Sequence, residues 1–143
     1  MITLEEYKPY IESELGEYSK YLDESVFNFL ENIKYKFYEI ARKYVPEGRI
    51  DKRWRMVIDY TFSRMRTELD KILSEAAKPL TPEEIKAAIK ESLPEQLSRA
   101  IAWARGMNSF LIELFEKDVE KSRNLARELM SLEREVREFK KVV

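Results

Sequence analysis

Apolar residues recur every three or four positions along most of this chain, which is the spacing of one face of an α-helix. One stripe starts at Leu4, a second runs from Val26 to Tyr44, and a third runs from Trp54 to Ala76. The sequence has neither the alternating pattern of strands nor the Asn-Gly and Asp-Gly pairs of tight hairpins. We therefore predict an all-α protein, a helical bundle of about five helices with a long C-terminal helix.

Prolines and capping residues predict where the first helices begin and end. Thr3 and Glu6 have the spacing of a capping box, and Pro9 offers a second start for the regular helix. Asp23 precedes the second stripe and is of a type favoured at the N-cap. The segment from Pro46 to Gly48 joins a proline to a glycine, so we expect the second helix to stop before it.

The third and fourth helices are bounded in the same way. The third is expected from Asp51 to Ala77, because Lys78 is followed by a proline. Thr81 and Pro82, with Glu84 three residues after the threonine, give the clearest start signal in the chain. They predict a short fourth helix.

The C-terminal part reads as a single long helix. Pro94 predicts a break, so we expect a bundle domain over residues 1–92 and the long helix over residues 93–143. From Leu111 onward, apolar residues repeat about every 3.5 positions, which is the seam of a helix that pairs with another helix. This seam either folds back onto the chain's own bundle or pairs with a partner chain, and the sequence leaves both alternatives open.

Two groups of residues are candidates for a partner interface. The first is the seam, whose candidate residues are Leu125, Leu129, Leu132, Val136 and Phe139. Charged residues that flank the seam would set partner and register, and they are Glu128, Arg134, Glu135 and Arg137. The second group is tyrosines outside the apolar stripes, since tyrosine is enriched at protein–protein interfaces; these are Tyr10, Tyr21 and Tyr35.

The composition argues against catalysis. The chain has no histidine and no cysteine, and only three glycines and five prolines. This removes most nucleophile–base pairs, the usual zinc ligands and every disulfide. Phosphate-binding glycine loops are also missing. The many carboxylates alternate with lysines and arginines at helix-surface spacing. We expect a protein that is not an enzyme and that needs no metal or cofactor.

The net charge is −1, but the charges are unevenly distributed. Residues 1–24 are mainly acidic and residues 49–78 are mainly basic, so the two segments either attract each other within the fold or serve different partners. A basic face over residues 49–66 is a candidate contact surface for a phosphate backbone. Its residues are Arg49, Lys52, Arg53, Arg55, Arg64 and Arg66.

The composition also bears on the environment in which the protein works. Hydrophobic residues make up 44% of the chain, enough for a real core, and charged residues make up 37%, which suits a protein from a hot environment. No apolar run approaches the roughly 20 residues of a membrane span, and no secretory signal is visible. We expect a cytoplasmic protein with no membrane contact.

Residues 1 to 90 resemble the helical domain of the smaller archaeal GINS subunits, which are assembly factors of the replicative helicase. The resemblance lies in the order of features. The short acidic helix over Leu4–Leu15 comes first, and Leu22–Glu24 then opens a long helix. A basic, aliphatic helix ends with Glu68–Ala77, and the capped start at Leu80–Glu84 follows. The chain departs from the family at Asp70, where a basic residue is usual, and in residues 94–143, which read as helix instead of the family's small β-domain.

The resemblance implies a non-catalytic scaffold subunit of a DNA replication complex. Such a subunit would associate with other subunits in a hetero-oligomer that contacts the helicase; a homodimer is the other assembly we consider. The alternative is a small helical nucleic-acid-binding subunit, of the type found in CRISPR effector complexes or as a primase accessory subunit. That protein would use the basic face of residues 49–66.

Overall fold

The computed structural model describes residues 1–106 and 117–142, with side chains described as far as Glu138. These residues form five α-helices and one short 3-10 helix, and no strand occurs among them. The predicted all-α bundle is therefore confirmed. In chain order, the elements are α1 (Leu4–Leu15), η1 (Gly16–Tyr21), α2 (Glu24–Arg42), α3 (Glu47–Glu75), α4 (Pro82–Gly106) and α6 (Val119–Val142).

The predicted capping residues start three of these helices. Thr3 and Glu6 form the expected capping box at α1, so the helix begins ahead of Pro9. The Asp23 carboxylate accepts two backbone N–H groups from the first turn of α2. At α4, the Thr81 hydroxyl accepts the Glu84 N–H and the Glu84 carboxylate accepts the Thr81 N–H, both at 3.2 Å. Each cap satisfies donors that the first helical turn leaves without an intrahelical partner.

Two boundaries differ from the prediction. Helix α3 begins at Glu47 and not at Asp51, because Pro46 occupies its N-cap with a backbone suited to helix entry. The predicted break at Pro94 is wrong: α4 continues through it, so the expected boundary between residues 92 and 93 lies within a helix. Leu93, Pro94 and Leu97 are buried, and this packing outweighs the roughly 3 kcal/mol that an interior proline costs a helix.

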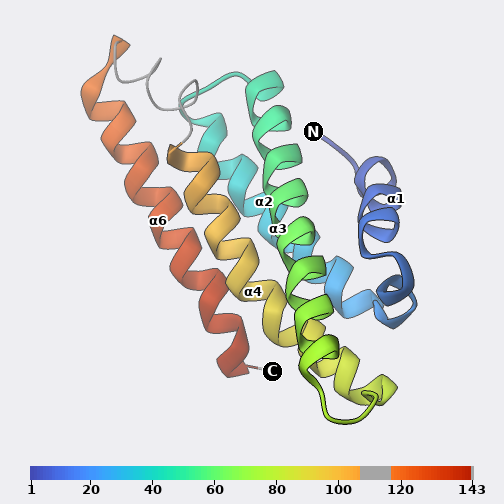
Figure 1. The fold of residues 1–143 in the computed structure, drawn as a ribbon. Coiled ribbons are helices and arrows are strands. Elements are labelled where there is room, and N and C mark those ends of the chain that lie inside the picture. The colour runs from blue at the N-terminus through green and yellow to red at the C-terminus, as the bar shows by residue number, and fades with distance from the viewer. Residues whose placement is uncertain (107–116, 143) are drawn as a thin grey trace.

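The helices form a bundle in which α4 lies between α3 and α6 (Figure 1). Helix α2 packs against both α3 and α6, and α1 lies along α3 on the side away from α6. None of the described helices combines the length and the apolar character that crossing a bilayer requires.

A continuous apolar core joins all of these helices. In its N-terminal half, the Trp54 ring contacts Tyr7 and Phe37, with ring centroids 6.3 Å and 5.7 Å apart, so that α1, α2 and α3 meet at one aromatic cluster. The same core extends through Leu97 and Ile101 of α4 to the apolar face of α6. The acidic first helix and the basic third helix thus lie side by side. This is the arrangement expected if the two segments attract each other within the fold.

The described residues of the C-terminal region do not form one continuous helix. Helix α4 ends at Gly106, and α6 returns beside it and contacts both α4 and α2. The seam therefore folds back onto its own bundle, which is the internal alternative of the two that the sequence left open. Leu111, Val143 and the side chain of Phe139, which belong to the predicted seam, lie outside the described residues.

Candidate nucleic-acid interface

The structure divides the predicted basic face of α3. With 3.6 residues per turn, Arg55 and Arg66 fall on one side of the helix, Arg49, Arg53 and Arg64 fall on another, and Lys52 lies between the two groups. Arg55 lies 4.0 Å from the Glu6 carboxylate of α1. Arg66 donates to the backbone oxygen of Glu14 at 2.9 Å, so it also serves contacts within the bundle.

The other four predicted basic residues of α3 are unequally accessible. Arg53 is only 7% exposed, its guanidinium donates to the Met56 sulfur at 3.1 Å, and burial lowers the pKa of its guanidinium. Arg49 is half-buried, whereas Lys52 and Arg64 are exposed. The six residues predicted as one phosphate-binding face therefore do not form one surface.

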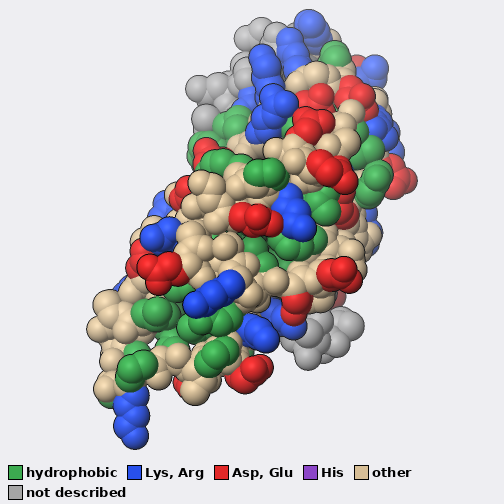
Figure 2. All heavy atoms as spheres, turned by 90° about the vertical axis from the view of Figure 1, so that its right-hand side faces the viewer, with side chains coloured by type: hydrophobic (Ala, Val, Ile, Leu, Met, Phe, Trp, Pro, Cys, Tyr) green, Lys and Arg blue, Asp and Glu red, His purple; other side chains and the backbone are tan. Residues whose placement is uncertain are grey.

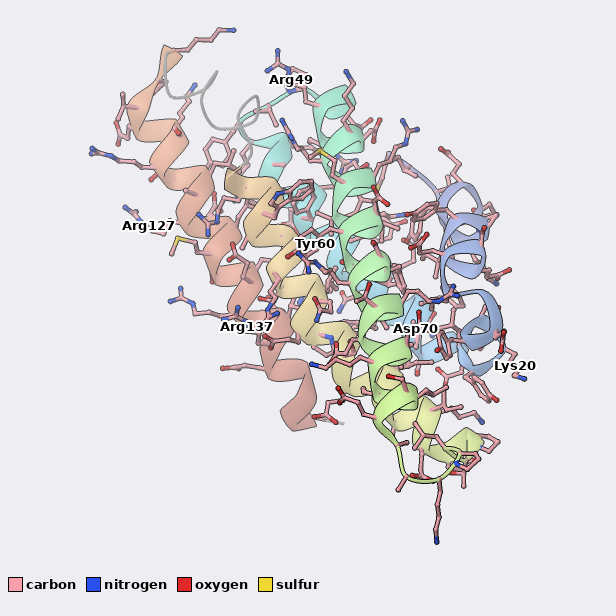
Figure 3. All side chains as sticks on the ribbon, in the orientation of Figure 1. Lys20, Arg49, Tyr60, Asp70, Arg127 and Arg137 are labelled. Carbon is pink, nitrogen blue, oxygen red and sulfur yellow. The ribbon has the colours of Figure 1, made fainter. Side chains whose placement is uncertain are left out.

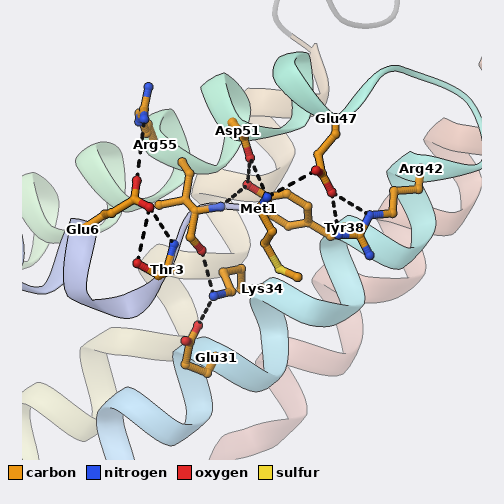
Figure 4. Close-up of polar contacts among 11 residues, drawn as sticks. Met1, Thr3, Glu6, Glu31, Lys34, Tyr38, Arg42, Glu47, Asp51 and Arg55 are labelled. Atoms are coloured by element: carbon orange, nitrogen blue, oxygen red, sulfur yellow. Dashed lines mark hydrogen bonds and ion pairs between the residues drawn. The ribbon is translucent and has the colours of Figure 1, made fainter.

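Carboxylates lie among these basic residues and reduce the positive potential of the predicted face. Figure 2 shows acidic and basic side chains mixed over the face of the molecule on the α1 side. Figure 4 shows how the contacts are made: Glu6 accepts from Thr3 and pairs with Arg55, while Glu31 pairs with Lys34 at 2.6 Å. Charge attraction between the N-terminal and middle segments is thus used inside the fold.

The predicted tyrosine surface is also dispersed. Tyr10 is 38% exposed, but its hydroxyl donates to the Asp59 carboxylate of α3. Tyr21 is half-buried against the core. Tyr35 is 56% exposed and lies under the Lys34 ammonium group, 5.0 Å from its ring centroid. The three residues lie on α1, η1 and α2, and each makes a contact within its own chain.

Four of the predicted seam residues are inside the molecule. Leu125, Leu129 and Val136 are 0% exposed, and Leu132 is 2% exposed. A partner chain cannot reach these side chains while α6 keeps its position, so the structure places them in the core and not at an interface.

Tyrosine–carboxylate hydrogen bonds join the helices around this core. Tyr7 donates to Glu31 at 2.6 Å, and Tyr38 donates to Asp51. Burial, reinforced by these hydrogen bonds, raises the pKa of both hydroxyls above their usual range. Burial and the bond to Asp70 similarly raise the pKa of Tyr18 to about 12.

Helix α6 directs several of its carboxylates toward the bundle. Glu128 pairs at 2.6 Å with Lys43, which directly follows α2, and accepts the Tyr44 hydroxyl, and these bonds hold the pKa of Glu128 below its usual value. Glu135 pairs with Lys36 of α2. On the other flank, Glu133 accepts from the Arg105 guanidinium of α4 at 2.9 Å.

The opposite side of α6 presents four arginines and a methionine to solvent. We call this surface the α6 ridge, and it consists of Arg123, Arg127, Met130, Arg134 and Arg137. All five side chains are exposed, and no ion pair joins the ridge arginines to any carboxylate in the described part of the chain. Figure 3 shows Arg127 pointing away from the other helices, with Arg137 further along the same helix.

Sequence reasoning recognised only part of this ridge. It took Arg134 and Arg137 as residues that flank the seam, and it did not consider Arg123 and Arg127. The signal was nevertheless present, because the ridge positions are spaced by four, three, four and three residues, which places them on one helical face. That the carboxylates of α6 pair inward was not visible in the sequence.

An exposed aromatic stack lies on the same molecule. The rings of Tyr60 in α3 and Trp103 in α4 are stacked, with centroids 5.3 Å apart and planes 27° apart. Trp103 is 40% exposed. The Arg64 guanidinium lies 5.3 Å from the Tyr60 ring centroid, and Figure 3 shows Tyr60 at the junction of α3 and α4.

Comparisons with protein families, with curated proteins and with solved structures found no match to this chain. Among the residues that the structure describes, no group of three or more carboxylates is placed to hold a metal ion. We therefore base the functional proposals on the α6 ridge and the Tyr60–Trp103 stack.

Proposed function

We propose that this protein is a non-catalytic helical subunit that acts by association, and that the α6 ridge binds the phosphate backbone of a nucleic acid. One observation carries the proposal: α6 turns Glu128, Glu133 and Glu135 toward basic groups of its own bundle and leaves an outward row of arginines. This separation leaves four exposed arginines on the outward side of α6.

The chemistry of arginine supports phosphate as the ligand. The guanidinium presents a planar fork of donors that matches phosphate oxygens and stays charged at any physiological pH. Arg123 and Arg137 are separated by a helical rise of about 21 Å, which spans several consecutive phosphates of a nucleic-acid strand. Within α6 the like-charged neighbours Arg123 and Arg127 destabilise the helix slightly, and a bound polyanion removes that repulsion.

The non-catalytic part of the proposal rests on the direction of the pKa shifts. Hydrogen bonding and burial raise the pKa of the Tyr7, Tyr38 and Tyr44 hydroxyls, and pairing lowers the pKa of the Glu47 and Glu128 carboxyls. A general acid or base working near neutral pH needs the opposite shifts. These groups therefore support a structural role.

The replication-complex role implied by the GINS resemblance stays a proposal, as does the CRISPR or primase accessory alternative. All of these roles place a small helical subunit beside nucleic acid within a larger assembly. In each, the α6 ridge would contact the backbone while other surfaces contact partner subunits.

The proposal is tested by fluorescence anisotropy with a labelled oligonucleotide at increasing salt concentration. If the four ridge arginines each contact a phosphate, the logarithm of affinity for a duplex falls with the logarithm of salt concentration with a slope of about −3.6. The double variant Arg127→Glu with Arg134→Glu should reduce the size of this slope by about 1.8 and weaken binding at least tenfold.

The matched control reverses two exposed charges of the originally predicted face, Lys52→Glu and Arg55→Glu. Arg53 is unsuitable for this control because it is buried. The control variant should bind as the unmodified protein does. Unchanged binding by the ridge variant would overturn the proposal. Loss of binding in the control variant alone would instead support residues 49–66 as the nucleic-acid-binding surface.

A further inference from the structure

The Tyr60–Trp103 stack is an exposed aromatic feature that the proposed function does not use. Trp103 is 40% exposed although tryptophan is a large apolar side chain, and Tyr60 packs against it across the α3–α4 junction. The stack orders the Trp103 ring on one side and leaves part of its surface to solvent. An ordered, accessible indole is suited to stacking against another flat group.

Two arginines lie near this stack. The Arg64 guanidinium lies 5.3 Å from the Tyr60 ring centroid and is exposed to solvent. Arg99 lies one helical turn before Trp103 on α4, and its side chain is 55% exposed although it pairs with Glu95 at 3.0 Å. A flat ligand that also carries negative charge therefore fits this site better than a neutral aromatic group does.

The stack and the α6 ridge lie at the same height along the bundle. The Ser98 hydroxyl donates to the Glu133 backbone oxygen at 3.0 Å, and Arg105 pairs with the Glu133 carboxylate. Trp103 lies between these two residues in α4, so it is within about one turn of the level of Glu133. Met130, at the centre of the α6 ridge, is one turn from Glu133 along α6.

We infer that the Tyr60–Trp103 stack is a base-stacking site and that this protein binds single-stranded nucleic acid more tightly than duplex. The inference rests on the proposed function of the α6 ridge. In a duplex the faces of the bases are covered by their neighbours, whereas an unpaired base has a free face that an aromatic side chain can cover. A strand bound along the ridge reaches the stack by crossing α4, a distance of about 10–20 Å for adjacent packed helices.

The two tryptophans allow a direct test on the full-length protein. Trp54 is 0% exposed in the core, so a ligand that stacks on the surface changes the fluorescence of Trp103 and not that of Trp54. A labelled oligothymidine of about 12 nucleotides is titrated while anisotropy and tryptophan fluorescence are recorded on the same samples. We expect saturable quenching of tryptophan fluorescence with the same midpoint as the anisotropy change.

Substitutions at Trp103 then separate stacking from folding. Trp103→Ala should weaken oligothymidine binding roughly tenfold and leave duplex binding unchanged, and Trp103→Phe should restore most of the lost affinity. Far-UV circular dichroism of each variant checks that the helices are retained. Equal affinity of the alanine variant and the unmodified protein for oligothymidine would overturn the inference.

The readouts distinguish failure of this inference from failure of the proposed function. Anisotropy that reports binding while tryptophan fluorescence stays constant rejects the stacking site but leaves the α6 ridge in place. Binding that survives Arg127→Glu with Arg134→Glu rejects the ridge. If neither oligothymidine nor duplex binds, both proposals are rejected, and the stack is then better explained as a docking point for a protein.

Discussion

At the scale of single residues, Lys34 shows how this fold accommodates charge in its interior. Its side chain is 2% exposed, yet its ammonium group donates to the Ile2 backbone oxygen at 2.9 Å and pairs with Glu31. The same carboxylate accepts the Tyr7 hydroxyl. A buried charge is tolerated only when it is paired and hydrogen-bonded, and these contacts provide both. The sequence pattern of α2 does not mark Lys34 as an interior residue.

Two glycines give a residue-scale prediction with its own control. Gly16 ends α1 with φ at 54°, and a Cβ built there would lie 3.1 Å from an Arg66 nitrogen. Gly16→Ala should therefore lower the free energy of unfolding by about 1 kcal/mol. Gly48 lies in α3 with open space around it, so Gly48→Ala should raise that energy by about 0.5 kcal/mol. Urea denaturation measures both changes in the free energy of unfolding. A stabilising effect of Gly16→Ala would contradict the positive φ described for this turn.

At the scale of elements, α4 and α6 differ most from what local signals predict. Pro94 reads as a helix break, but the apolar side chains on both sides of it are buried in the core and hold α4 together. The seam of α6 reads equally well as an internal or an external surface. Contacts with Lys36 of α2, with Lys43 directly after α2 and with Arg105 of α4 attach α6 to the bundle at its rim.

A pair of adjacent residues tests the position of α6. Leu129 is 0% exposed and Met130 is 46% exposed. Leu129→Ala should lower the free energy of unfolding by about 3 kcal/mol, because it leaves a cavity in the core. Met130→Ala should change that energy by less than about 0.5 kcal/mol. Urea denaturation and size-exclusion chromatography measure the outcome. If Leu129→Ala dissociates an oligomer without lowering stability, α6 pairs with another chain.

At the scale of the whole molecule, tyrosine–carboxylate bonds connect helices that are distant in sequence. Tyr18 of η1 donates to Asp70 of α3, and Tyr44, in the turn after α2, donates to Glu128 of α6. Each bond needs a protonated hydroxyl as donor, so the integrity of the bundle depends on the protonation of several tyrosines together.

This dependence predicts cooperative unfolding at alkaline pH. An unfolded tyrosine loses its proton near pH 10, whereas the folded bundle raises the pKa of Tyr18 to about 12 and that of Tyr7, Tyr10 and Tyr38 as well. The folded state then binds more protons than the unfolded state above pH 10. The stability contributed by these groups is therefore complete below about pH 10 and is lost as pH rises toward 12.

Far-UV circular dichroism and tyrosinate absorbance, recorded together across this pH range, measure the transition. Helix loss and tyrosine ionisation should coincide, and Tyr18→Phe should make the transition less steep because one linked proton is removed. Gradual ionisation near pH 10 with constant helix content would show that these hydroxyls are not coupled to folding.

Features that depend on neighbouring residues could be predicted from the sequence alone. Apolar periodicity and the capping residues Thr3, Asp23 and Thr81 defined an all-α fold and three helix starts, because a cap and a helical stripe involve residues only a few positions apart. The spacing of the α6 arginines was equally local.

Which surfaces remain available depends on the tertiary structure. It places Leu129 in the core, buries Arg53, and pairs Glu128 and Glu135 of α6 with Lys43 and Lys36. These outcomes depend on contacts between residues far apart in the chain, and the sequence pattern of each helix is compatible with several such arrangements. The charge pattern of a helix is set by its own sequence, whereas the neutralisation of those charges depends on how that helix packs against a second one.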